Sequence, residues 1–88
     1  MKIELYSIPG DKEGDLIKAF LMKNNLKFHE IVTKDINLLS KICQAPISNK
    51  ISIARIRNPH NIHIIRGFNE LAFNQLIKHI KKYNPMVI

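Results

Sequence analysis

The chain has a single cysteine, Cys43, among its 88 residues. One thiol excludes an internal disulfide and excludes a redox pair made of two cysteines of the same chain. Proteins without disulfides are typical of reducing compartments. We therefore expect a cytoplasmic protein.

Long apolar runs are also missing. The longest are as short as residues 19–22 (Ala-Phe-Leu-Met), far below the roughly 18 residues that a membrane span needs. The N-terminal segment carries Lys2 and Glu4 and lacks the apolar stretch of a secretory signal. The expectation is a soluble protein without a membrane partner.

The length sets the number of domains. Domains commonly have about 100–150 residues, so 88 residues allow one. Hydrophobic residues make up 45% of the chain, which excludes disorder as its main state. Neither a linker nor an internal repeat is visible. We predict a single domain over residues 1–88, with 84–88 as a C-terminal tail.

Acidic residues are scarce in the second half of the chain. Residues 1–44 hold seven lysines and six acids, whereas residues 45–88 hold seven basic residues against Glu70 alone. The net charge is therefore +1 for the first half and +6 for the second, which favours an acidic partner for the second half. A basic surface that only keeps the protein in solution is the alternative.

Hydrophobic periodicity predicts a short α/β protein. The expected elements are a strand at 2–7, a helix at 11–25, a strand at 26–32, a helix at 33–44, strands at 47–57 and 62–66, and a helix at 69–83. In the first helix, Leu16, Ile17, Phe20 and Leu21 form the expected buried stripe. The order β-α-β-α-β-β-α requires a parallel pair and an antiparallel hairpin, and thus a four-stranded mixed sheet flanked by helices.

Three short motifs, taken in this order, resemble the glutaredoxin branch of the thioredoxin fold. Residues 3–10 (Ile-Glu-Leu-Tyr-Ser-Ile-Pro-Gly) look like the first glutaredoxin strand and the entry to its active site. Gln44-Ala45-Pro46 stands where the family has Thr-Val-Pro with a cis proline, and residues 67–71 (Gly-Phe-Asn-Glu-Leu) look like the opening of its last helix. The resemblance implies a glutaredoxin-type, thioredoxin-like fold over nearly the whole chain.

The active-site motif departs from that family. Where glutaredoxins continue with Cys-x-x-Cys, this chain has Asp11-Lys12-Glu13-Gly14. Thiol exchange requires a thiolate, which neither a carboxylate nor a glycine supplies. Asp11 and Gly14 are thus a degenerate redox motif, and Asp11 is suited to cap the helix that follows. We expect no catalytic residue.

The resemblance also implies a groove for glutathione. Its positions correspond to Ala45, Pro46, Gly67, Phe68 and Asn69, of which Asn69 replaces the acid that would meet the amine of the ligand. Residual glutathione binding through the backbone is one interpretation. The other is that Pro46 only shapes the entry to the next strand, and that no cofactor binds.

The hairpin of the second half is the main candidate for binding. Arg55, Arg57, His60, His63 and Arg66 surround one expected turn. The planar fork of arginine suits phosphate and carboxylate. Alternatively, positive side chains on an edge strand prevent pairing with other strands. His60 and His63 are too few for a metal site, so none is predicted.

Three functions follow in order of preference. The first is a redox-inactive glutaredoxin-like protein that binds another protein. The second is a nucleic-acid-binding module that uses the 55–66 hairpin, although no exposed aromatic platform is evident. The third is a glutathione-dependent or monothiol enzyme that uses Cys43, Tyr6 or Ser7, against which Cys43 reads as a small, half-buried hydrophobic residue.

Overall fold

The computed structural model describes residues 2–44 and 51–83. Within them lie four strands and three helices in the order β-α-β-α-β-β-α. The elements are β1 (Lys2–Ser7), α1 (Lys12–Lys23), β2 (His29–Val32), α2 (Ile36–Cys43), β3 (Ile53–Arg57), β4 (Ile62–Arg66) and α3 (Glu70–Tyr83). The predicted α/β class is therefore confirmed. Ala45, Pro46 and the 84–88 tail lie outside the described residues.

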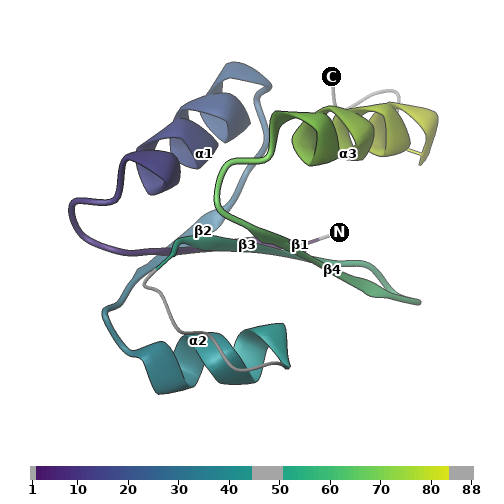
Figure 1. Ribbon diagram of the computed structural model, residues 1–88. Coiled ribbons are helices and arrows are strands. Elements are labelled where there is room, and N and C mark those ends of the chain that lie inside the picture. Colours follow the sequence, from purple (N-terminus) through teal and green to yellow (C-terminus); the bar gives the residue numbers. More distant parts are fainter. Residues whose placement is uncertain (1, 45–50, 84–88) are drawn as a thin grey trace.

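The strands form one mixed sheet in the order β2-β1-β3-β4. β1 pairs in parallel with β2 and antiparallel with β3, and β3 pairs antiparallel with β4. α1 and α3 cover one face of the sheet, and α2 lies on the other (Figure 1). This arrangement confirms the predicted four-stranded mixed sheet flanked by helices.

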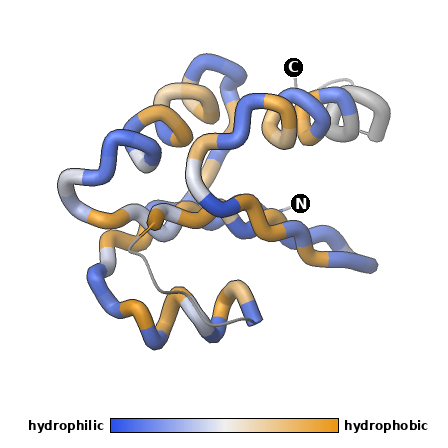
Figure 2. Tube along the Cα trace, viewed as in Figure 1, coloured by the Kyte–Doolittle hydropathy of each residue, from blue (hydrophilic) through white to orange (hydrophobic). Residues whose placement is uncertain are grey.

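β1 is buried on both faces because it is a central strand with helices on either side. Ile3 and Leu5 belong to the core beneath α1 and α3, whereas Tyr6 belongs to the core above α2. Along the helices, hydrophobic and hydrophilic residues alternate as one side of each packs on the sheet (Figure 2). The core thus consists of two layers separated by the sheet.

Side chains at the helix starts explain where the first two helices begin. Asp11 caps α1 by accepting from the Glu13 N–H, and Asp35 caps α2 by accepting from the N–H groups of Asn37 and Leu38. Such caps satisfy donors that the helix itself leaves unpaired. The capping role predicted for Asp11 is confirmed.

Three local predictions were wrong. The strand expected at 47–57 begins at Ile53, and residues 51–52 precede it without strand structure. The second strand was expected from Leu26, but β2 begins at His29. Leu26 instead closes α1, because its N–H donates to the Leu21 carbonyl at 3.0 Å while Asn25 adopts a positive φ of 57°. Leu16, expected in the buried stripe, is 50% exposed.

No helix in the described part of the chain is long and apolar enough to cross a membrane.

Candidate functional site: the start of α1 and the basic hairpin

Asp11 ties the start of α1 to the segment that enters β3. One carboxylate oxygen, Oδ1, accepts from the Glu13 N–H at 3.2 Å, and the other, Oδ2, accepts from the Ser52 N–H at 3.0 Å. Both oxygens of the carboxylate are therefore occupied by backbone donors. Asp11 holds two distant segments together, which is a structural task.

The pKa of Asp11 lies below its ordinary value of 3.8. Burial acts to raise this pKa, but hydrogen bonds from the Ser52 hydroxyl and from the N–H groups of Ser52, Glu13 and Gly14 outweigh burial and lower it. The folded protein thus prefers the ionised carboxylate. Its contribution to stability is present above the unfolded-state pKa and is lost as the pH falls through the folded-state pKa.

Replacing Asp11 with asparagine is expected to lower the free energy of unfolding by about 1–2 kcal/mol at neutral pH. Asparagine can still cap α1 through its oxygen, but its NH₂ group would face the Ser52 N–H, a donor against a donor. Urea unfolding at pH 7 and at about pH 3 measures the effect, and the difference from the parent should shrink at the lower pH. An equal difference at both pH values would contradict this role of the Asp11 charge.

Gly14 stands where the resemblance to glutaredoxins would place a second cysteine, and it has no room for a side chain. A Cβ atom built on Gly14 would lie 2.6 Å from the Ser52 Oγ and 3.8 Å from the Ser7 Cβ. Ser52 is fully buried, and its Oγ accepts from the Ile8 N–H at 3.0 Å. The position is therefore filled by a packing contact and holds no reactive group.

Cys43 is separated from this region. It is the last residue of α2, is partly buried, and packs against the core on the α2 side of the sheet. α1 lies on the other side (Figure 1). The sheet therefore stands between the lone thiol and α1, the helix that Asp11 caps.

The three described positions of the expected glutathione groove lie together at the entry to α3. The Gly67 N–H donates to the Ser52 carbonyl at 2.7 Å, and the Phe68 N–H donates to Glu13 Oε1 at 3.2 Å. Asn69 caps the helix by accepting from the Ala72 N–H at 3.1 Å. The Glu13 carboxylate therefore accepts the hydrogen bond of the Phe68 N–H, a backbone group that the resemblance assigns to glutathione binding.

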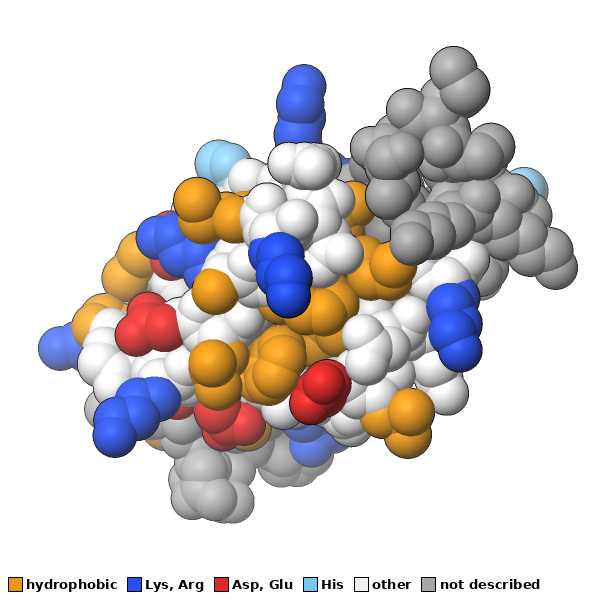
Figure 3. Space-filling view, turned by 90° about the horizontal axis from the view of Figure 1, so that it is seen from above, with side chains coloured by type: hydrophobic (Ala, Val, Ile, Leu, Met, Phe, Trp, Pro, Cys, Tyr) orange, Lys and Arg blue, Asp and Glu red, His pale blue; other side chains and the backbone are white. Residues whose placement is uncertain are grey.

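The aromatic residue of that entry faces inward. The Phe68 ring stacks on Phe73 with a centroid distance of 5.7 Å, and Phe20 lies 6.1 Å from Phe68. Seen from the side of α1 and α3, hydrophobic side chains gather between the two helices, with acidic and basic side chains around them (Figure 3). A shallow pocket lies between these two helices, and its lining residues are Leu16, Ala19, Phe20, Lys23, Asn24, Phe68, Glu70 and Asn74.

Arg55 and Arg57 share one internal carboxylate. Glu4 Oε1 accepts from Arg55 Nε at 3.0 Å and lies 2.9 Å from Arg55 Nη2 and 3.1 Å from Arg57 Nε. The Tyr6 hydroxyl accepts from Arg55 Nη2 at 2.7 Å, and the Arg55 guanidinium also lies over the Tyr6 ring, 5.4 Å from its centroid. Two arginines with one acid leave a single positive charge.

The other three basic residues of the predicted binding site, His60, His63 and Arg66, do not lie on one face of the hairpin. His60 lies in the turn, and Arg66 lies opposite Ile53 at the far end of β4, on the α2 side. His63 lies opposite Ile56 and therefore points toward α3. Among residues 2–44 and 51–83, no group of three His, Cys, Asp or Glu side chains could hold a metal ion.

Ser52 and Glu13 are two site residues that the sequence analysis missed. Ser52 contacts Asp11 across 41 positions of sequence, and Glu13 contacts Phe68 across 55. No local pattern signals contacts of such range.

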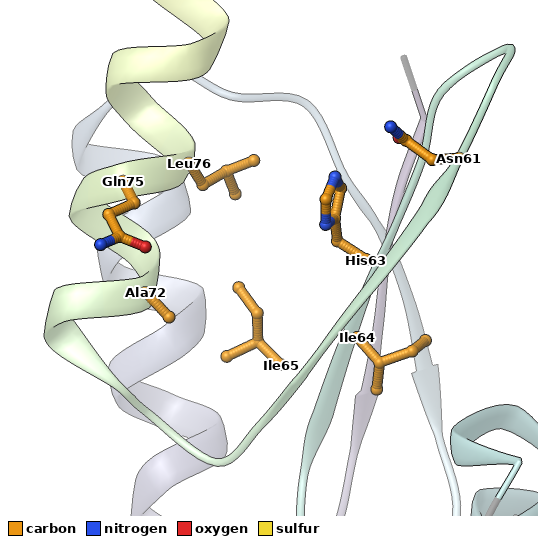
Figure 4. A pocket seen from close by; sticks show the side chains of 7 residues that line it. All are labelled: Asn61, His63, Ile64, Ile65, Ala72, Gln75 and Leu76. Carbon is orange, nitrogen blue, oxygen red and sulfur yellow. The ribbon is translucent and has the colours of Figure 1, made fainter.

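A groove lies beside the edge strand β4. It has a volume of about 440 Å³ and lies between β4 and α3. Its lining residues are Asn61, His63, Ile64, Ile65, Ala72, Gln75 and Leu76 (Figure 4).

No protein-family model matches the chain, and neither a curated protein nor a solved structure is significantly similar to it.

Proposed function

We propose that this chain is a redox-inactive protein with a glutaredoxin-type, thioredoxin-like fold, and that it acts by binding another protein. The sheet order β2-β1-β3-β4 and the placement of α1 and α3 opposite α2 support that fold. One observation carries the functional part. The two positions of the lost Cys-x-x-Cys motif are built into the scaffold, Asp11 through its bonds and Gly14 through its packing.

Thiol chemistry at this place would need a thiolate beside the start of α1. The Asp11 carboxylate holds two backbone donors there, and Gly14 contacts Ser52. Cys43 lies in α2, beyond the sheet. These positions support a protein that binds without exchanging disulfides.

Nucleic-acid binding is the second candidate, favoured by the net charge of +6 in residues 45–88. Two contacts weaken it. Arg55 and Arg57 are held by Glu4, and the rings of Phe20, Phe68 and Phe73 pack on one another instead of standing apart as a platform for bases. Glutathione-dependent chemistry is third, because Glu13 already occupies the Phe68 N–H.

A mixed-disulfide reduction assay with glutathione tests the proposal. The parent protein and Cys43→Ser should both show no turnover above buffer, since Cys43 is the only thiol and lies away from the start of α1. Turnover by the parent that Cys43→Ser removes would contradict a redox-inactive protein.

A further inference from the structure

The outer edge of β4 carries backbone groups that point away from the sheet. The Gly67 N–H donates to the Ser52 carbonyl, and the Asn58 N–H donates to the Asn61 carbonyl. These two bonds show which residue pairs along the hairpin exchange backbone hydrogen bonds and which do not. In an antiparallel pair, every second residue exchanges hydrogen bonds with the partner strand, here His63 and Ile65 of β4. The N–H and C=O groups of the residues between them therefore point outward, and these residues are Ile62, Ile64 and Arg66.

These outward groups are spaced for a further strand. Among residues 2–44 and 51–83, none forms a hydrogen bond with them. Ile62 is also 57% exposed, although it is a large hydrophobic residue. An edge with such groups is a template on which an extended peptide can add a strand.

The groove between β4 and α3 lies on one side of this edge. Ile65 of β4 and Ala72 and Leu76 of α3 give it apolar lining, and the polar side chains of His63 and Gln75 line it as well (Figure 4). A strand added to β4 would direct every second side chain to this side of the sheet. Apolar side chains of moderate size suit the groove.

The opposite side of the same edge is positive. Arg66 lies on β4 itself, and Arg57 stands directly across from Ile62. Residues 51–69 contain three arginines and no acid. Glu4 balances only one of Arg55 and Arg57, and Glu70 borders the pocket between α1 and α3 instead. The other set of side chains on an added strand should therefore be acidic.

We propose that β4 binds an extended segment of a partner protein that alternates acidic with apolar residues, and that this segment extends the sheet as a fifth strand. This inference rests on the proposed function and names its partner. The apolar side chains occupy the groove beside Ile65 and Leu76, and the acidic ones face Arg66. Main-chain hydrogen bonds to Ile62, Ile64 and Arg66 set the register.

Charge argues against a second copy as the occupant. Two chains of net charge +7 repel each other. Antiparallel pairing of two β4 strands about Ile64 would also leave Arg66 opposite Ile62 of the other copy, so that no acid meets the arginine. An acidic strand satisfies this charge, and a basic one is repelled.

The probe is a short fluorescein-labelled peptide that alternates glutamate with valine, measured by fluorescence anisotropy. The controls are the same peptide with lysine in place of glutamate, a peptide of the same composition with its valines grouped together, and a single-stranded oligonucleotide. We expect the alternating acidic peptide to bind at least about tenfold tighter than either control peptide. Tighter binding of the oligonucleotide, or equal binding of the two glutamate peptides, would overturn the inference.

Amide hydrogen exchange locates the contact. The N–H groups of Ile62, Ile64 and Arg66 should exchange at least about tenfold more slowly with the acidic peptide bound. Those of His63 and Ile65 already bond to β3 and should change little. Protection that appears without peptide and grows with protein concentration would assign the edge to a second copy and overturn the inference.

Two variants separate backbone pairing from charge. Ile62→Pro removes one outward N–H at an exposed edge position where proline is tolerated, and Ile62→Thr keeps that N–H as the matched control. Proline should weaken binding about tenfold relative to threonine. Arg66→Glu should reverse the preference, so that the lysine peptide binds better, a gain that an unfolded variant cannot produce. Failure of that reversal would contradict the role of Arg66.

The two proposals fail in different ways. If the acidic peptide does not bind and the disulfide assay stays silent, only the β4 inference is overturned. If Cys43 supports turnover, the redox-inactive function is overturned, whatever the peptide does.

Discussion

Replacing Glu4 with glutamine is expected to lower the free energy of unfolding by about 2–3 kcal/mol. The Glu4 side chain is only 9% exposed, and its Oε1 lies within 3.1 Å of nitrogen atoms of both Arg55 and Arg57. Without the carboxylate, the guanidinium of Arg55, whose side chain is only 22% exposed, loses its counter-charge. The full cost of a broken buried pair is about 3–5 kcal/mol, and partial exposure of the arginines reduces it.

Urea unfolding of Glu4→Gln and of Arg57→Gln provides the comparison. Arg57 is 40% exposed and contacts the same carboxylate, so its loss should cost less than about 1 kcal/mol. A Glu4→Gln protein as stable as the parent would contradict the internal pairing. The arginines would then be available to external anions, and the nucleic-acid alternative would gain support.

Replacing Gly14 with alanine is expected to destabilise the fold by about 2–3 kcal/mol. Intrinsic helix propensity alone would favour alanine by up to about 1 kcal/mol, so the sign of the effect is diagnostic. The new Cβ would lie 2.6 Å from Ser52 Oγ, which must move and release the Ile8 N–H. Ser52 has no exposed surface into which it could turn.

A double-mutant cycle isolates this contact. Ser52→Ala removes the hydroxyl, after which Gly14→Ala should cost less than about 1 kcal/mol further, because only the Ser52 Cβ at 3.3 Å remains close. Chemical unfolding of the four proteins measures the coupling. An equal cost of Gly14→Ala in both backgrounds would show that Gly14 does not depend on Ser52.

Local signals in the sequence predicted much of the fold. β1, β4 and the hairpin follow from alternation and from the turn residues between the strands, and the capping role of Asp11 follows from its place before α1. The errors are also local in origin. Leu26 continues an apolar pattern that resembles a strand, but Asn25 turns the chain and makes Leu26 part of the helix end.

The exposure of Leu16 has a different cause. α1 buries Gly14, Ile17 and Leu21 against the sheet, and this stripe passes beside Leu16. Periodicity alone predicts a wider apolar face and cannot tell which residue lies at its margin.

The site was less predictable than the fold because its contacts are long-range. Arg55 lies directly across from Glu4 in the register of β1 and β3, so the two pair once the sheet is known. From composition alone, Arg55 and Arg57 indicate an external anion. The groove beside β4 depends on how α3 crosses the hairpin, and spacing within either element does not reveal it.

The glutathione mixed-disulfide assay tests the central claim most directly when Asp11→Cys, made in a Cys43→Ser background, is measured beside the parent. A thiol at the start of a helix is more readily deprotonated than an ordinary one. We predict no turnover above buffer for the parent and measurable turnover for the Asp11→Cys, Cys43→Ser protein, because its only thiol then lies at the start of α1, the position that the resemblance to glutaredoxins assigns to the nucleophile. Turnover by the parent through Cys43, with none from the introduced cysteine, would contradict the account.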